Sequence, residues 1–155
     1  MRLRIAAVGQ RMPGWVATGV EEFTRRMPRE LPLEIVEIPA SRARRGGDTA
    51  RATAEEGERL LAAAKGARIV ALDEGGRSLT TAALATYLDE WRMDGDDVAF
   101  LIGGADGLAR ECRQRAGLVW SLSALTFPHM LVRVILAEQL YRAWTVLSNH
   151  PYHRD

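Results

Sequence analysis

The sequence predicts a single α/β domain built on a mostly parallel sheet with helices on both faces. Short apolar runs alternate along the chain with segments of helical spacing, and the connections between them are short. Several of these runs are apolar throughout, as in strands that are buried on both sides. The 155 residues suffice for one domain with a sizeable core. We find no repeat, linker or low-complexity stretch that would divide 1–155.

The first elements are a strand, a helix and a second strand. The run LRIAAVG at 3–9 is apolar and closed by glycine, which predicts a buried strand. Pro13 and Gly14 open a segment with helical spacing of apolar residues. LEIVEIP at 33–39 alternates and predicts a strand, in an edge position of the sheet. The apolar positions of the helix are Val16, Val20, Phe23 and Met27.

The middle of the chain begins with the polar, glycine-bearing segment SRARRGGD at 41–48, which predicts a mobile loop. Asp48 is suited to cap a helix that runs to about Lys65. RIVALD at 68–73 predicts a third strand, and EGGRS at 74–78 predicts a turn.

The remaining elements continue the alternation. Thr80 or Thr81 can cap a helix that buries apolar residues from Leu84 to Trp91. The expected elements that follow are a strand at 97–104, a short helix at 107–116, a strand at 118–125 and a long helix after Pro128.

The long last helix carries two apolar stripes about a third of a turn apart. One stripe suffices to dock the helix on a sheet, so the second indicates burial against a further body. A wide core-facing arc inside a monomer is the alternative. The first stripe is Val132, Leu136, Leu140, Ala143 and Leu147, and the second is Met130, Val134, Ala137, Tyr141 and Trp144.

Composition excludes several classes of protein. A formal charge of +1 argues against an extended nucleic-acid-coating surface. Cys112 is the single cysteine, so neither an intrachain disulfide nor a cysteine metal site is possible, which fits a reducing cytoplasm. No apolar stretch reaches the length of a membrane span, and the opening run is too short for a signal peptide.

Three loops should form a ligand site, because ligands of open α/β sheets lie beyond the carboxyl ends of the strands. The loops contain LDEGG, IGGADG and SLSALTFPH. Their glycines allow close approach of the backbone, but GGADG is no dinucleotide or phosphate-loop motif. The loops therefore predict a site that contacts its ligand through backbone groups and apolar walls.

Other polar residues have two interpretations each. His129 could act as a base, although a capping or packing role is the simpler interpretation. Asp73, Glu74 and Asp106 could bind a cation, but their spacing fits no metal loop and a solvated loop is favoured, so we expect no metal. The arginines at 42–45 could contact phosphate or lie in a solvated loop.

The C-terminal third makes the pattern specific. LIGGADG, followed by WSLSALTFPHMLVRVILAEQLYRAWTVLSNHPYHR, closely resembles the RlmH family of small SPOUT-class methyltransferases. MPGWV, EIVEIPA and RIVALDEGG lie where members of that family carry similar segments, so the resemblance covers the whole chain. SRARRGGDTARAT departs most from the family pattern, with arginines where relatives often have lysines.

The resemblance implies an S-adenosylmethionine-dependent enzyme that methylates N3 of a pseudouridine in large-subunit (23S) ribosomal RNA. It also implies a homodimer, a C-terminal trefoil knot, a cytoplasmic location and a substrate that is RNA within the ribosome. By match to the family's binding segments, the cofactor pocket is lined by Leu72, Gly103, Leu122, Ser123, Ala124, Leu125, Thr126 and Phe127. These residues lie in the three loops that follow the strands.

The tail LSNHPYHRD then has a chemical interpretation. The N3 atom of pseudouridine carries a proton, which a positioned base can remove, and a cation can stabilise the resulting anion. We expect His153 to be the base, Arg154 the anion stabiliser or phosphate clamp, and Tyr152 a stacking or hydrogen-bonding wall. The tail should dock at a dimer interface and complete the partner's pocket, or else become ordered only on RNA.

Two other functions fit the same pattern. The protein could be a non-catalytic, ribosome-associated dimer that retains the cofactor, or a related methyltransferase that acts on transfer RNA. Methyl transfer to ribosomes, subunits and free RNA, followed by nucleoside analysis, separates them.

Overall fold

A computed structural model describes residues 1–154, in which five parallel strands form one sheet. The strand order is β2-β1-β4-β3-β5, so β2 lies at an edge, as its alternating sequence predicts. The strands are β1 (Leu3–Val8), β2 (Leu33–Ile38), β3 (Arg68–Ser78), β4 (Val98–Ile102) and β5 (Leu118–Ser121). The predicted α/β class is confirmed.

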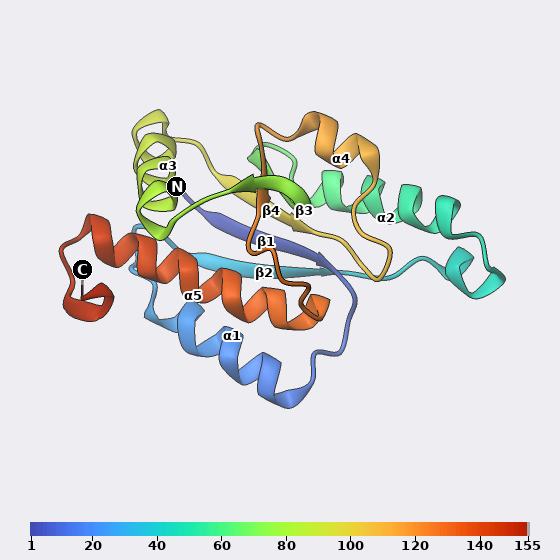
Figure 1. Cartoon of the computed structure of the whole chain (residues 1–155), viewed down its shortest axis with the longest axis horizontal. Helices are drawn as coiled ribbons and strands as arrows, with labels where there is room; N and C mark the ends of the chain where they lie inside the picture. The colour runs from blue at the N-terminus through green and yellow to red at the C-terminus, as the bar shows by residue number, and fades with distance from the viewer. Residues whose placement is uncertain (155) are drawn as a thin grey trace.

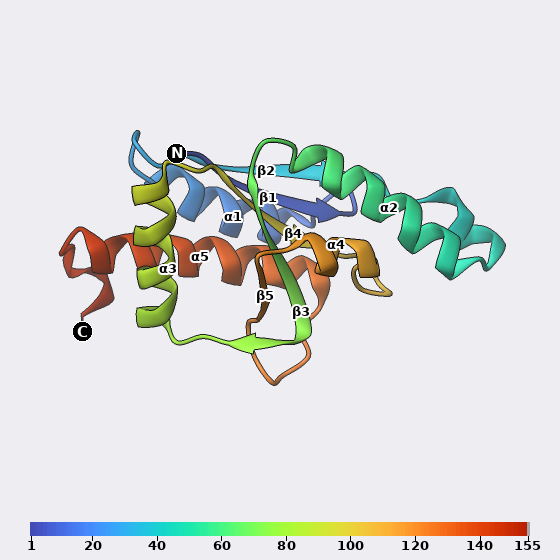
Figure 2. The same ribbon diagram turned by 90° about the horizontal axis from the view of Figure 1, so that it is seen from above.

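Helices cover both faces of this sheet (Figures 1 and 2). One face carries α1, α3 and α5, and the other carries α2 and α4. The helices are α1 (Gly14–Arg26), α2 (Thr49–Ala63), α3 (Thr81–Asp94), α4 (Arg110–Arg115) and α5 (His129–Leu147), with short 3-10 helices η1 (Arg42–Gly46) and η2 (Pro151–His153). Among the described residues, no helix is long and apolar enough to cross a membrane.

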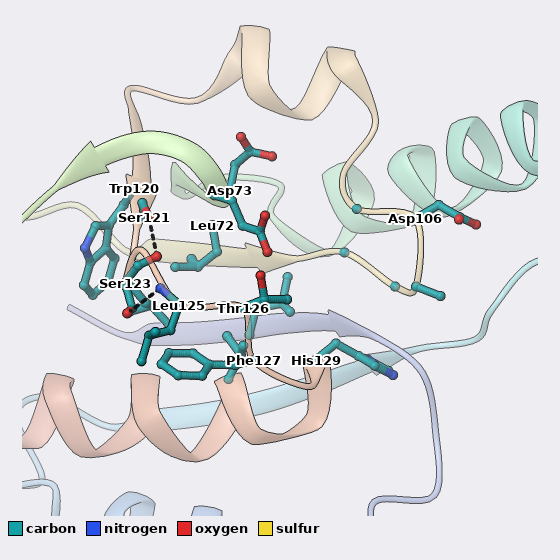
Figure 3. A pocket seen from close by; sticks show the side chains of 18 residues that line it. Leu72, Asp73, Asp106, Trp120, Ser121, Ser123, Leu125, Thr126, Phe127 and His129 are labelled. Atoms are coloured by element: carbon teal, nitrogen blue, oxygen red, sulfur yellow. Dashed lines mark hydrogen bonds between the residues drawn. The ribbon is translucent and has the colours of Figure 1, made fainter.

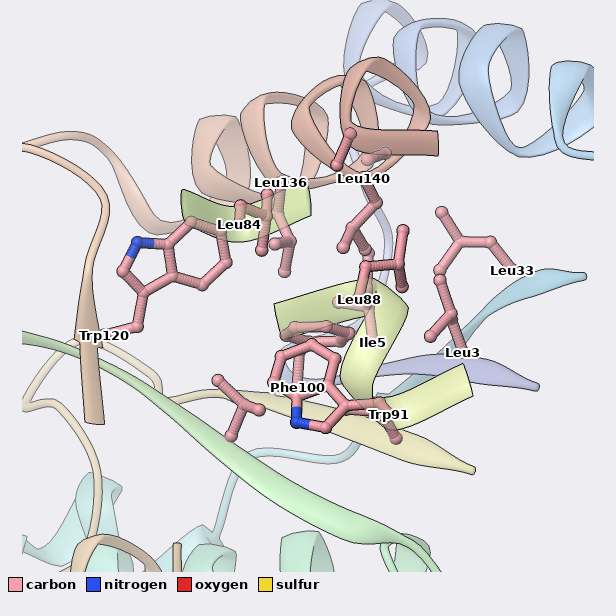
Figure 4. Packing of buried hydrophobic residues seen from close by; sticks show 14 of the residues in the cluster. Leu3, Ile5, Leu33, Leu84, Leu88, Trp91, Phe100, Trp120, Leu136 and Leu140 are labelled. Atoms are coloured by element: carbon pink, nitrogen blue, oxygen red, sulfur yellow. The ribbon is translucent and has the colours of Figure 1, made fainter. Parts of the chain in front are cut away.

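The core follows from the two-residue period of the strands. In β1, Leu3, Ile5 and Ala7 point to the layer of α3 and α5, whereas Ala6 and Val8 point to α2 and α4. Figure 4 shows the first of these layers, in which aromatic and leucine side chains from the sheet meet α3 and α5. Both layers are apolar, which explains why the central strands have almost no polar positions.

Two predicted helix caps are confirmed. The Asp48 side chain accepts a hydrogen bond from the backbone N–H of Arg51, and the Thr80 hydroxyl accepts one from Ala83. These bonds satisfy backbone donors of the first turn that have no partner inside the helix.

Three local predictions are wrong. Residues 42–46 form η1 instead of a mobile loop, because Ser41 caps them and Arg44 pairs with acidic residues. Residues 74–78 continue β3 through a bulge instead of forming a turn. β5 ends at Ser121, so 122–125 leaves the sheet as a loop. The extension of β3 depends on Gly76, because a Cβ on this residue would lie 2.7 Å from the Val119 carbonyl oxygen of β5. Glycine thus allows β3 to pass closely over β5.

Both predicted stripes of α5 are used within the chain. Leu136 and Leu140 of the first stripe are buried against the sheet and α3. In the second stripe Val134 lies against Gly19 of α1, and Tyr141 stacks near Phe23 of the same helix. The body that covers much of the second stripe is therefore α1, which is the monomer alternative. The homodimer and the trefoil knot stay predictions.

Candidate active site

A cavity of about 510 Å³ lies beyond the carboxyl ends of β3, β4 and β5 (Figure 3). The bulged part of β3, the ends of β4 and β5 with the loops that follow them, and the first turn of α5 form its walls. This is the position expected for a ligand of an open parallel sheet, and the volume lies in the range of small-molecule sites. The sequence predicted this location from the same three loops.

The loop after β4, which we call the glycine loop (residues 103–107), forms one wall of the cavity. It folds back on itself through an antiparallel bridge between Gly104 and Gly107, closed by a hydrogen bond of 3.0 Å from the Gly107 N–H to the Gly104 carbonyl. A Cβ on Gly103 would lie 2.4 Å from the carbonyl carbon of Gly107. No side chain fits there, so the wall consists of backbone.

The loop after β5 forms the opposite wall and is held by Ser123. Its hydroxyl accepts a hydrogen bond of 2.9 Å from the Leu125 N–H, and its carbonyl accepts one of 3.0 Å from the Ser121 hydroxyl. These bonds turn the chain sharply at the end of β5, which directs Thr126 and Phe127 toward the cavity.

The structure brings together most residues that the sequence assigned to the cofactor. Seven of the eight line the cavity: Leu72, Gly103, Leu122, Ser123, Leu125, Thr126 and Phe127. The eighth, Ala124, lies in the same loop but not in the cavity wall.

Three acidic residues that we interpreted as a solvated loop also line the cavity, namely Asp73, Glu74 and Asp106. Asp73 accepts a hydrogen bond of 3.0 Å from the Gly75 N–H, which leaves other oxygen lone pairs for a ligand. Within residues 1–154 no group of three or more side chains could hold a metal ion. Asp73 and Glu74 lie in the bulged part of β3 and Asp106 in the glycine loop, so two of the three predicted ligand loops already contained them.

Arg133 of α5 joins the start of that helix to β1 and β2. Its side chain is fully buried and pairs with Glu37 at 2.8 Å, while Nη2 donates to the carbonyl oxygens of Val8 (3.3 Å) and Gly9 (2.8 Å). A buried arginine requires such partners. Arg133 therefore fixes the first turn of α5, and the sequence signal for it is a lone charge between two apolar stripes.

His129 begins α5 at the edge of the cavity. Burial and, to a smaller extent, the positive charge of Arg133 lower the pKa of His129 below its usual range. Its Nδ1 is buried and has no hydrogen-bond partner in the described part of the chain. His129 is consequently a neutral imidazole at neutral pH, able to accept or donate a hydrogen bond inside the cavity.

The C-terminal tail folds back on the other end of α5. The Tyr152 hydroxyl donates a hydrogen bond of 3.0 Å to Glu138, and the Arg142 guanidinium lies 4.8 Å from the centre of the Tyr152 ring. Burial and the hydrogen bond to Glu138 raise the pKa of Tyr152. The rings of Tyr141 and Tyr152 also meet edge to face. These contacts hold the tail against α5, and no sequence pattern indicated that Glu138 is its partner.

The two residues after Tyr152 differ in exposure. The side chain of His153 is half-buried, and its Nδ1 has no hydrogen-bond partner among residues 1–154. Arg154 is exposed and adopts a left-handed backbone conformation with φ 55°. The guanidinium of Arg154 is thus open to a ligand, whereas the Nδ1 of His153 is buried and unpaired within the described residues.

The tail and the cavity lie at opposite ends of α5 (Figure 1). The cavity includes His129 and Val132 of the first turn of this helix and none of the tail residues, whereas Tyr152 contacts Glu138 and Arg142. The structure of one chain therefore does not bring Tyr152, His153 and Arg154 to the predicted cofactor residues.

Comparison with known proteins identifies relatives over the full length. A family model described as "Predicted SPOUT methyltransferase" matches residues 1–153. Two proteins called Ribosomal RNA large subunit methyltransferase H are similar to this chain. The one from Hahella chejuensis is 51% identical and covers 100% of both chains. The one from Methylococcus capsulatus is 56% identical, with coverage of 99% of this chain and 100% of its own.

Solved structures show the same fold at low identity. A probable methylase family protein from Haemophilus influenzae has a TM-score of 0.61 and 14% identity, covering 97% of this chain and 69% of its own. A putative methyltransferase from Legionella pneumophila, solved in complex with its cofactor SAM, has a TM-score of 0.50 and 11% identity, covering 93% and 66%. Fold, length and sequence agree with one assignment: the chain belongs to the SPOUT methyltransferase family, and within it to the group of the ribosomal RNA large subunit methyltransferase H proteins.

Proposed function

We propose that this protein uses S-adenosylmethionine to methylate N3 of a pseudouridine in large-subunit (23S) ribosomal RNA, on the ribosome and thus in the cytoplasm. The observation that carries the proposal is the similarity over the full chain to two proteins called ribosomal RNA large subunit methyltransferase H. The atom and the base are those that the sequence resemblance implies.

The cavity fits this cofactor in its chemistry. The glycine loop offers backbone N–H and C=O groups, while Leu72 and Phe127 offer apolar surface. The carboxylate of Asp73 can accept hydrogen bonds from hydroxyl groups and favours a positively charged ligand. S-adenosylmethionine, when bound, supplies a methyl group that its sulfonium centre already activates.

The protein then has to place and activate the acceptor nitrogen. Correct placement of reactants can contribute about 7–11 kcal/mol to lowering a barrier. The N3 proton of the base must be removed, and we assign this step to His153. Arg154 is positioned next to it in the chain and stabilises the negative charge that develops on the base, and Tyr152 provides a wall for the ring.

We assign the supply of these residues to a second copy of the chain. None of Tyr152, His153 and Arg154 lines the cavity of its own chain, and contacts with Glu138 and Arg142 hold the tail against α5. We therefore propose a homodimer in which the tail of one subunit completes the cavity of the other. The exposed Trp15, with 64% of its surface accessible, begins α1 beside α5 and is available for such an interface.

The test uses ribosomes from cells that lack this protein, because their target base is unmodified. The purified full-length chain and S-adenosylmethionine with a labelled methyl group are incubated with assembled ribosomes, isolated large subunits, free large-subunit RNA or transfer RNA. Digestion to nucleosides and mass spectrometry then locate the methyl group. We expect methylpseudouridine in ribosomes and little product on free RNA, since recognition depends on the folded assembly.

Two outcomes would contradict the proposal. Methylation confined to transfer RNA would indicate a related enzyme with a different substrate. Binding of S-adenosylmethionine without transfer to any of the four acceptors would indicate a non-catalytic dimer.

A further inference from the structure

A buried carboxylate lies directly behind the glycine loop. Glu56 of α2 has 2% of its surface accessible. It accepts a hydrogen bond of 2.9 Å from the Ser41 N–H and one of 2.6 Å from Nη2 of Arg44. A Cβ on Gly104 would lie 3.7 Å from Glu56 Oε1, which places this carboxylate against the glycine loop.

Arg44 extends from η1 to the glycine loop itself. While Nη2 pairs with Glu56, Nη1 forms an ion pair with the Asp106 carboxylate. Asp106 lines the cavity. A single guanidinium therefore connects a buried anchor on α2 with a loop that forms a cavity wall.

The neighbouring arginines do not share this arrangement. Arg42 and Arg45 are exposed, and within residues 1–154 neither makes a hydrogen bond or an ion pair from its side chain. The three arginines have the same chemistry and lie on one turn of η1, but one of them alone reaches the cavity wall. Variants of the three arginines can therefore distinguish an effect of positive charge in general from an effect of the bridge that Arg44 forms.

We propose that Arg44 is a positioning residue for cofactor binding. Glu56 anchors its guanidinium, and the guanidinium holds Asp106 so that the glycine loop keeps the conformation that forms the cavity wall. The planar fork of arginine can pair with two carboxylates at once, whereas a lysine ammonium is a single point charge. The inference rests on the proposed function, because it concerns the S-adenosylmethionine site.

The test measures the dissociation constant for S-adenosylmethionine by calorimetry. Arg44→Gln removes both ion pairs of the bridge, and Asp106→Asn removes the charge of the Asp106 partner. The double variant combines both changes. Arg42→Gln and Arg45→Gln are matched controls on the same turn. We expect Arg44→Gln to weaken binding by at least about fivefold, the lower range of typical coupling between sites, and the two controls to bind like wild type.

The double variant distinguishes positioning from direct contact. If Arg44 acts through Asp106, Asp106→Asn adds nothing in the Arg44→Gln background. If Asp106 contacts the cofactor independently, the two effects multiply, and the bridge is contradicted. In turnover assays the bridge predicts a higher KM for S-adenosylmethionine with kcat nearly unchanged at saturation, because the acceptor half of the site is untouched.

Arg44→Gln leaves Glu56 buried without its cation and can prevent folding. Arg44→Lys avoids this, since it keeps a positive charge beside Glu56 but cannot bridge both carboxylates. We expect normal thermal unfolding and weakened binding for this variant. If Arg44→Lys, and Arg44→Gln where it folds, bind S-adenosylmethionine with wild-type affinity, the proposed bridge is wrong and the proposed function is unaffected. A wild-type chain that does not bind S-adenosylmethionine would overturn the proposed function as well.

Discussion

The hydroxyl group of Tyr152 donates a hydrogen bond of 3.0 Å to the carboxylate of Glu138, fourteen residues earlier in the chain. Arg142 approaches the same carboxylate with Nε at 3.1 Å and covers the Tyr152 ring with its guanidinium. The last turn of the chain is thus fixed to α5 by one carboxylate. This contact makes the tail a preformed surface that a second subunit can use.

Tyr152→Phe tests whether this contact matters for function. Loss of one hydrogen bond to a charged group removes about 1.5–3 kcal/mol of local stabilisation, so the tail should undock more often. We expect a lower rate of methyl transfer with unchanged affinity for S-adenosylmethionine. Tyr87→Phe is the control, because its hydroxyl bonds to Arg77 away from the tail. Equal rates for the two variants would contradict a role for docking.

Gly103→Ala tests the cavity wall. The added Cβ would lie 2.4 Å from the backbone of Gly107, so the glycine loop has to move. We expect loss of S-adenosylmethionine binding by calorimetry with a nearly unchanged helical signal in circular dichroism. Gly14→Ala is the control, since nothing lies within 4 Å of a Cβ there. Wild-type affinity in Gly103→Ala would show that the cofactor binds elsewhere.

His129 predicts a pH dependence of stability. Its pKa is lower in the folded chain than its ordinary value of about 6.5, so the unfolded chain binds the proton more tightly. Stability from this group is therefore complete above pH of about 7 and falls as the pH decreases toward the lowered pKa. Urea unfolding should show wild type losing stability relative to His129→Asn between pH of about 8 and about 5.5. A constant difference between the two proteins would contradict this assignment.

His153→Ala tests the proposed base. Removal of a general base reduces the rate by about 10²- to 10⁴-fold. The deficit should shrink as pH rises, because the N3 group then ionises without help. Methyl transfer to ribosomes is measured across the pH range for both proteins. If the rate of His153→Ala is lower than that of wild type by the same factor at every pH, His153 is not the base and acts by positioning the substrate.

The sequence predicted the sheet and the location of the cavity because both depend on short-range patterns. Runs such as VAFLI in β4 are apolar throughout, and glycines mark the strand ends. The extension of β3 beyond Asp73 was missed for a long-range reason. Gly76 lies against the backbone of Val119, a contact between residues far apart in sequence that no local turn pattern reveals.

Charged residues of the site were the least predictable. Glu56 lies four residues from both Ala52 and Leu60 on the buried face of α2. Its partners Ser41 and Arg44 lie outside that helix, so the local pattern does not name them.

Arg133 lies between the two apolar stripes of α5, and this position indicates that its charge has a buried partner. The sequence does not show that the partner is Glu37. The role expected for the tail came from resemblance to a family, because no local pattern connects Tyr152 with Glu138.

Mixed dimers test whether two subunits share each active site. A chain that stops after Pro151 lacks the tail, and Gly103→Val lacks a usable cavity, so each variant should be inactive alone. In a mixed dimer the tail of the second chain meets the intact cavity of the first. Random mixing of the two should restore about a quarter of the wild-type rate of methyl transfer to ribosomes. If co-purification shows that mixed dimers form and yet no activity returns, each subunit uses its own tail and the account is wrong.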